Sequence, residues 1–253
     1  FVSIYDITEK NIDEEILQKI TNIAKTYSLE DILHHRVELP KGLEHPLPLF
    51  KEYLRHGYYP FGDDVEFIML LNQSVNLTME VDIPQFANMT LSTSRKLKKL
   101  LAIVSRSVPF KPVMDSLATM VGVSRNVLPG YFLYMEKAGI ISQLRDATGG
   151  IRGLGKVDKV YLDNPNLAYI LAGSEANIGN VRETFFYNQL RVHNDIIVSR
   201  ISDFEINGVT FEVGGKSKGQ KQIVEAKKGY VVKDDIEIGT SNIIPLWMFG
   251  LNY

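Results

Sequence analysis

The chain of 253 residues contains no cysteine. This absence excludes disulfide bonds, thiolate metal ligands and a cysteine nucleophile, and it is compatible with the cytoplasm, where we expect the protein to reside. The sequence also lacks any apolar run close to the roughly 20 residues that a membrane span needs, so we expect no membrane partner. A formal net charge of −2 gives the whole protein no strong attraction to polyanions, although a local basic patch is still allowed.

Signatures of common enzyme classes are scarce as well. The five histidines show no metal-ligand spacing, and no G-x-S-x-G motif of a serine hydrolase is present. Residues 150–156 fit the spacing G-x-x-x-x-G-K of a phosphate loop, but Val157 follows where that loop needs Ser or Thr,. We interpret these glycines as the tip of a β-hairpin, so the sequence itself carries no ATP site.

The first third of the chain predicts a helical segment. Isoleucines at 12, 16, 20 and 23 lie on one face of an amphipathic helix over residues 11–27,. Residues 65–81 are strongly apolar and predict a buried helix. We assign residues 1–92 to this helical segment. Because the chain starts at Phe1 within what reads as mid-domain sequence, we expect it to be a piece of a longer protein.

Residues 93–165 predict a winged helix. A helical stripe over 94–106 is followed by a short helix over 113–121 and by a third helix from Ser124 to about Ala138, where Gly139 can end it,. Apolar stretches at 140–144 and 159–162 then predict a β-hairpin. Three helices followed by a hairpin, with a glycine turn between the second and third helix, are typical of this module.

Two interpretations of this module stay open. Six basic residues are candidates for contacts with nucleic acid, and DNA is then the expected partner: Arg95, Lys98, Lys99, Arg125, Arg152 and Lys156,. The third helix, however, offers mostly apolar side chains instead of the Arg, Lys, Asn and Gln that read base edges, and it contains Pro129,. The module could therefore bind a protein partner or another copy of the chain.

Residues 166–253 predict an α/β domain. A helix is expected over 177–190, and strands are expected at 196–198, 209–213, 230–232 and 243–249,. The predicted fold class is thus α+β multidomain, with a helical N-terminal segment, a winged helix and an α/β domain in that order.

Acidic residues in this last domain suggest PD-(D/E)XK nuclease chemistry. The candidate catalytic residues are Glu183, Asp203, Glu212 and Lys216. Asp203 and Glu212 could hold Mg²⁺, which prefers oxygen ligands and activates water against a phosphodiester, and a lysine beside them stabilises developing charge. On a strand the lysine should stand two residues after Glu212, where this chain has Gly214. A bulge could return Lys216 to the site; alternatively, Glu212 and Lys216 form an ordinary ion pair in an inactive nuclease-like fold.

Seven stretches of the chain resemble the C-terminal region of a large prokaryotic family of AAA-type P-loop ATPases. They are YLRHGYYP (53–60), GVSR (122–125), LYMEKAG (133–139), KVYLDN (159–164), GNVRET (179–184), FEVGGK (211–216) and IPLWMFG (244–250). The resemblance implies a winged helix followed by a PD-(D/E)XK-like domain of unknown function. It also implies an upstream ATPase domain, so ATP would enter only through that missing domain. Many relatives have Glu-x-Lys where this chain has Glu212-Val213-Gly214-Gly215-Lys216.

Three functional hypotheses follow. The leading one is an accessory region of an ATPase that contacts nucleic acid or a partner protein and has no chemistry of its own. The second is an active, magnesium-dependent nuclease that uses the four candidate residues above. The third is a structural or oligomerisation unit for the ATPase.

Overall fold

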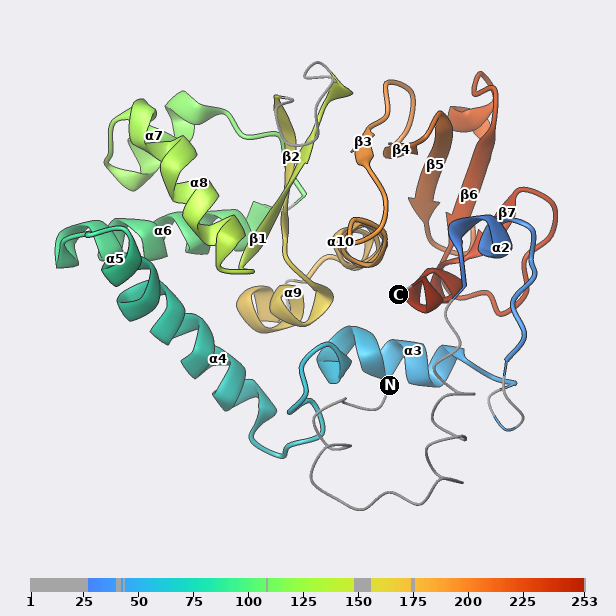
Figure 1. The fold of residues 1–253 in the computed structure, drawn as a ribbon, viewed down its shortest axis with the longest axis horizontal. Helices are drawn as coiled ribbons and strands as arrows, with labels where there is room; N and C mark the ends of the chain where they lie inside the picture. Colours follow the sequence, from blue (N-terminus) through green and yellow to red (C-terminus); the bar gives the residue numbers. More distant parts are fainter. Residues whose placement is uncertain are drawn as a thin grey trace.

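The computed structural model describes residues 27–39, 42, 44–107, 109–147, 156–173 and 176–252. The helix expected over 11–27 therefore lies almost wholly outside the described residues. Within the described ranges the protein has nine α-helices and a seven-stranded mixed sheet, which confirms the mixed α+β class (Figure 1).

The α-helices run through the whole described chain. They are α2 Leu29–Leu33, α3 Leu47–Glu52, α4 Phe67–Leu77, α5 Ile83–Phe86, α6 Leu91–Ser107, α7 Met114–Val121, α8 Leu128–Lys137, α9 Pro165–Ala172 and α10 Ile178–Leu190. Two π-helical turns extend α3 and α4, namely η2 Tyr53–Gly57 and η3 Thr78–Asp82. Three 3₁₀ segments are η4 Arg125–Val127, η7 Lys221–Ile223 and η8 Leu246–Leu251.

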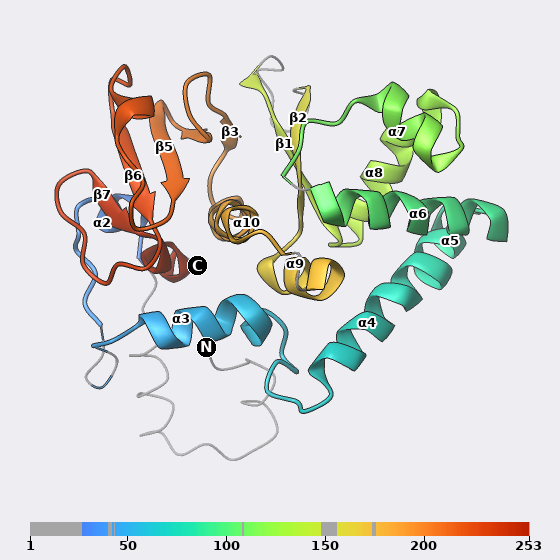
Figure 2. The same ribbon diagram turned by 180° about the vertical axis from the view of Figure 1, so that it is seen from behind.

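One sheet connects the hairpin with the C-terminal strands. The strands are β1 Ile141–Arg145, β2 Val157–Leu162, β3 Ile196–Val198, β4 Phe204–Ile206, β5 Val209–Gly214, β6 Gly229–Lys233 and β7 Ile243–Pro245, in the spatial order β2-β1-β3-β4-β5-β6-β7. Strands β5, β6 and β7 are parallel. The hairpin joins through one parallel pair, Arg145 with Ile197. Figures 1 and 2 show α10 below the point where the hairpin and the other strands meet.

Helices α6, α7 and α8 occupy the ranges that the sequence predicts, with one local difference. Ser124 makes no side-chain capping bond. The chain instead enters through the 3₁₀ turn η4, and Pro129 lies in the first turn of α8, where its missing N–H has no intrahelical partner to lose. Gly122 and Gly139 both have positive φ, at 79° and 68°, so the two glycines end α7 and α8 in the left-handed conformation.

The prediction of a buried helix over 65–81 is wrong in its burial. Helix α4 buries only the face that carries Phe67, Leu71 and Val75. Ile68 on the other side is 66% exposed. Gln73 and Asn76 are exposed on α4, and polar residues on one side are the pattern of a helix that buries only its other face.

The strand expected over 243–249 is shorter than predicted. Pairing with β6 ends at Pro245, which has no N–H to donate to a ladder. The following residues form η8, where Trp247 and Phe249 are buried, and Phe249 meets Phe186 of α10 edge-on at a centroid distance of 4.9 Å. Packing under α10 therefore replaces strand pairing.

The N-terminal segment packs against the C-terminal strands and helices. The backbone N–H of Tyr27 donates to the carbonyl of Leu251 (2.9 Å). Phe50 of α3 meets Phe185 of α10 at 4.8 Å between ring centroids, and the side-chain amide of Gln189 donates to the Tyr53 hydroxyl (3.0 Å). Residues from the three regions assigned by sequence thus share one hydrophobic core.

None of the helices in the described ranges combines the length and the hydrophobicity of a membrane span.

Candidate functional site

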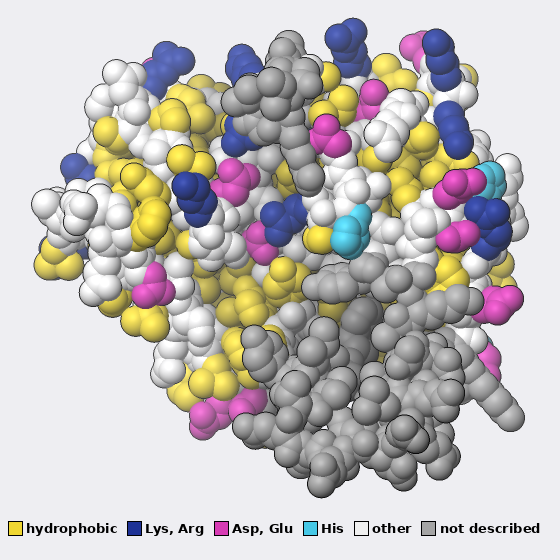
Figure 3. Space-filling view, viewed as in Figure 1, with side chains coloured by type: hydrophobic (Ala, Val, Ile, Leu, Met, Phe, Trp, Pro, Cys, Tyr) yellow, Lys and Arg dark blue, Asp and Glu magenta, His cyan; other side chains and the backbone are white. Residues whose placement is uncertain are grey.

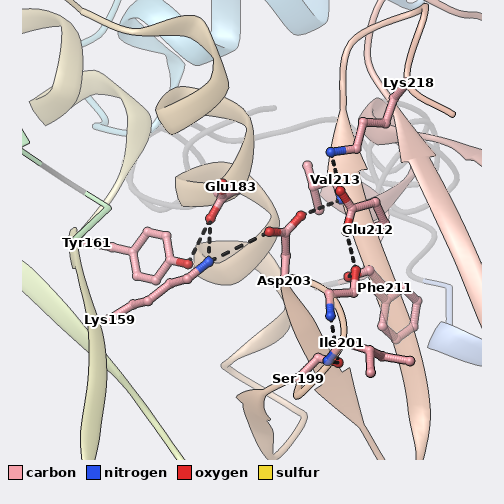
Figure 4. A network of polar contacts seen from close by, with 11 residues as sticks. Lys159, Tyr161, Glu183, Ser199, Ile201, Asp203, Phe211, Glu212, Val213 and Lys218 are labelled. Carbon is pink, nitrogen blue, oxygen red and sulfur yellow. Dashed lines mark hydrogen bonds and ion pairs between the residues drawn. The ribbon is translucent and has the colours of Figure 1, made fainter. Parts of the chain in front are cut away.

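The three carboxylates proposed from the sequence meet in one polar network, which we call the carboxylate cluster (Figure 4). Glu183 comes from α10, Asp203 immediately precedes β4, and Glu212 lies near the end of β5. Two lysines complete the network, Lys159 from β2 and Lys218 from the segment after β5. The cluster therefore forms only because the hairpin, α10 and the C-terminal strands pack together.

Helix α10 is fixed by both its start and its packing. Asn177 caps it, and its side-chain oxygen accepts from the N–H of Gly179 (2.8 Å),. Phe185 and Phe186 are fully buried two and three residues after Glu183. A helix held this firmly places Glu183 against β2 with little freedom to move.

Lys159 bridges two of the carboxylates. Its Nζ lies 3.3 Å from Oε2 of Glu183 and 3.7 Å from Oδ1 of Asp203. Tyr161, two residues further along the same face of β2, donates its hydroxyl to Oε2 of Glu183 (3.0 Å),. The positively charged ammonium group of Lys159 thus lies between the carboxylates of Glu183 and Asp203.

Asp203 is the most perturbed acid in the cluster. Its Oδ2 accepts from the backbone N–H of Val213 (2.9 Å). Burial and then the nearby charges of Glu183 and Glu212 raise its pKa from 3.8 to about 6, against the opposing effects of the Val213 N–H and Lys159. Burial, followed by the charge of Glu183, also raises the pKa of Tyr161 well above its usual value, so Tyr161 stays protonated and serves as a donor.

Glu212 points away from α10. Its neighbour Phe211 packs on Phe186 of that helix, at 5.3 Å between centroids, and successive side chains of a strand point to opposite faces. Glu212 is only 1% exposed. Its Oε2 accepts a hydrogen bond from the Ser202 hydroxyl, and its Oε1 forms an ion pair with Lys218.

Glu212 forms its ion pair with Lys218, whereas Lys216 is exposed to solvent. Gly214 explains why Lys218 can reach Glu212. A Cβ at position 214 would lie 2.6 Å from Cγ of Lys218, so the missing side chain leaves room for the Lys218 stem. A turn, in which the Lys218 N–H donates to the Gly215 carbonyl (2.9 Å), returns the chain over the strand end. The sequence expectation that a bulge returns Lys216 to the site is therefore wrong, because β5 pairs regularly with β6 to Gly214 and the turn that follows brings Lys218 to Glu212.

The cluster as built does not fit Mg²⁺. In the part of the chain that the structure describes, no group of three or more Asp, Glu, His or Cys residues is arranged to hold a metal ion. Both oxygens of Glu212 already have partners from the chain itself, and Lys159 contacts the other two acids. Metal binding by Asp203 and Glu212 stays a prediction, and we derive no reaction step through a metal.

The candidate basic residues lie in different surroundings. Arg95 and Lys99 are exposed on α6, and Lys156 is exposed beside the start of β2. Lys98 forms an ion pair with Glu80 at 2.6 Å, and Arg125 forms one with Asp115 at 3.2 Å. Arg152 lies outside the described residues.

Arg106 is a further basic residue of α6, and the sequence pattern places it with Arg95 and Lys99 on the polar side of this helix. It is exposed near the end of α6, and it follows Arg95 and Lys99 by eleven and seven residues, spacings that place all three on one helical face. No ion pair joins any of the three to a described residue. We call Arg95, Lys99 and Arg106 the basic face of α6. The composition agrees with such a face, since residues 93–165 contain twelve Lys and Arg against five Asp and Glu.

The exposed surface of α8 is apolar by comparison. Leu133 is 42% exposed there. Phe86 of α5 is 73% exposed and meets Tyr134 of α8 edge-on at 6.4 Å. Figure 3 shows hydrophobic side chains among the polar ones over the α4–α8 side of the molecule, with Lys and Arg distributed across the same face.

Comparison with family models, curated proteins and solved structures found no match. The resemblance to the ATPase family therefore stays a prediction from the sequence.

Proposed function

We propose that this chain binds nucleic acid through the phosphate backbone and does not cut it, as an accessory C-terminal region of a P-loop ATPase. The observation that carries the proposal is the basic face of α6, whose three cations are exposed and unpaired within the described chain. Cations of this kind neutralise phosphates and give affinity without reading sequence. The order of α6, α7, α8 and the hairpin supports a winged-helix module that presents this face.

The absence of cleavage follows from the carboxylate cluster. A metal-dependent nuclease needs carboxylate oxygens that are free to bind a cation. In this cluster one carboxylate oxygen of Glu212 forms an ion pair with Lys218, and the other accepts a hydrogen bond from Ser202. Lys159 lies between Glu183 and Asp203. We therefore interpret the C-terminal domain as a PD-(D/E)XK-like scaffold in which lysines stand where a metal would be needed.

Fluorescence anisotropy with a labelled DNA duplex tests the proposal. Three phosphate contacts predict that affinity falls about 40-fold between roughly 50 and 200 mM salt. Lys99→Ala should lower the slope of log affinity against log salt by about 1. Lys221→Ala is the matched control, because Lys221 is also exposed but lies on the connection between β5 and β6. Equal effects of the two substitutions, or no binding at low salt, would refute a phosphate-binding role of α6.

The apolar surface of α8 supports a second candidate function, which is binding of a protein partner or self-association. The exposed side chains of Leu133 and Phe86 carry this alternative, since neither offers a hydrogen bond to a base. Sedimentation velocity of the wild-type chain and of Leu133→Glu tests self-association. A wild-type dimer that the substitution dissociates would support it, and a monomer at all concentrations would exclude it.

A further inference from the structure

A groove separates α4 from α6. The two helices form the arms of a V that meet near α5, and α9 lies between the arms (Figures 1 and 2). The hollow has a volume of about 190 Å³ and lies outside the carboxylate cluster. Its lining comes from α4, the turn η3 that follows it, α6 and α9.

The charged lining of this groove is entirely positive. Lys98 and Arg106 are its charged residues. Lys98 also bonds Glu80 at 2.6 Å, but both side chains are well exposed, and an exposed pair of this kind is weak enough to exchange partners. Arg106 is exposed and has no ion pair in the described chain. The groove therefore favours a ligand with an anionic group, and the planar guanidinium suits a phosphate in particular.

The remaining lining has two further parts. Val75, Met79 and Leu101 are buried and provide an apolar floor. At the rim, Asn72 donates one amide hydrogen to the Ile68 carbonyl (2.8 Å), which orients its amide group, and Asn76 is an exposed second amide. An apolar floor with a few placed polar groups is typical of small-molecule sites, and side-chain amides pair with the edges of bases.

We propose that this groove binds a nucleoside phosphate, with the base over the apolar floor and the phosphate at Arg106 and Lys98. The hollow of about 190 Å³ is smaller than the roughly 300 Å³ at which small-molecule pockets begin, so it holds only part of one nucleotide and the rest extends from the open rim,. A free mononucleotide and one unit of a single-stranded nucleic acid offer the same chemistry. In the second case the site rests on the proposed function and extends it, because Arg106 belongs both to the groove and to the basic face of α6.

Isothermal titration of adenosine monophosphate and of a short single-stranded oligonucleotide into the whole chain tests the site. Binding of the mononucleotide should be saturable, and Arg106→Met should weaken it about tenfold or more, the loss expected for a charge-assisted hydrogen bond. Arg95→Met is the control, because Arg95 lies on the same helix but does not line the groove. Asn72→Leu replaces an amide at the rim by an apolar side chain without removing charge, and it should weaken mononucleotide binding as well.

The results separate this site from the proposed function. Mononucleotide binding that Arg106→Met weakens and Arg95→Met leaves unchanged supports the groove, even if the duplex does not bind. Tight oligonucleotide binding that Arg106→Met weakens more than Arg95→Met identifies the strand as the source of the ligand. Absence of saturable binding of both the mononucleotide and the oligonucleotide, or equal losses in Arg106→Met and Arg95→Met, overturns the site, even if the duplex binds through the basic face.

Discussion

Lys218 forms an ion pair with Glu212 across the space that Gly214 leaves open (Figure 4). Glu212 is almost completely buried, so its charge depends on this partner,. We expect Lys218→Met to lower the free energy of unfolding by about 3 kcal/mol, because it leaves a buried carboxylate unpaired. Urea denaturation measures this loss. Lys216→Met, which removes an exposed lysine two residues earlier, should change stability by less than about 0.5 kcal/mol, and a larger loss in Lys216→Met than in Lys218→Met would contradict the pairing.

A double substitution separates pairing from packing. Glu212→Gln together with Lys218→Met leaves no unpaired charge in the interior, so it should cost less than Lys218→Met alone. If the two losses simply add, Lys218 does not neutralise Glu212.

Gly214→Ala tests the space above the strand end. An alanine Cβ would lie within 2.6 to 2.8 Å of three carbons of the Lys218 stem, so the stem must move and the ion pair must weaken. We expect a loss of about 1–3 kcal/mol in thermal or urea unfolding, the range typical of overpacking. Gly219→Ala is the control, since a Cβ there meets nothing within 4 Å. Equal stabilities of the two variants would show that Lys218 does not depend on Gly214.

The raised pKa of Asp203 predicts a pH dependence of stability. The folded chain holds the proton up to about pH 6, whereas the unfolded chain releases it near 3.8. Asp203 therefore contributes about 3 kcal/mol to the free energy of unfolding below pH 3.8, and this contribution is lost as the pH rises to 6. Asp203→Asn lacks this titration. The free energy of unfolding of the variant minus that of the wild type should thus rise between pH 4 and 7, and a constant difference would contradict the perturbed pKa.

Phe50 tests whether the N-terminal segment belongs to the C-terminal fold. Its ring is buried and packs edge-on against Phe185 of α10. Phe50→Ala should cost about 3–5 kcal/mol in a single cooperative unfolding transition. Leu49→Ala, at an exposed position on the same helix, should cost less than about 1 kcal/mol. An early, separate transition for Phe50→Ala would indicate that α3 docks as an independent unit.

Local patterns in the sequence predicted the elements better than their burial. The range 196–198 is β3 to the residue, and α10 starts directly after its Asn177 cap, because an apolar β-branched run and an N-cap act locally. The single-sided packing of α4 and the 3₁₀ segment η8 were missed. Both depend on which neighbours the fold supplies, and apolar residues alone do not specify that.

The sequence named three acids as site candidates but neither of the lysines that contact them. Lys159 contacts Glu183 and Asp203, whereas Glu212 pairs with Lys218. Strand alternation placed the expected lysine at Gly214, whereas Lys218 arrives by a turn that only the folded chain reveals. Lys159 lies 24 residues before Glu183 and reaches it because the hairpin joins the sheet beside β3, a long-range pairing that no local pattern encodes.

The most direct test of the account incubates a labelled DNA duplex with the chain and Mn²⁺ at low salt, and measures both its mobility and its length on gels. We predict a shifted duplex that stays intact, because the basic face of α6 binds phosphates while Lys159 and Lys218 occupy the carboxylates. Cleavage that depends on Mn²⁺ and disappears in Glu212→Gln would contradict the account and would identify the chain as an active nuclease.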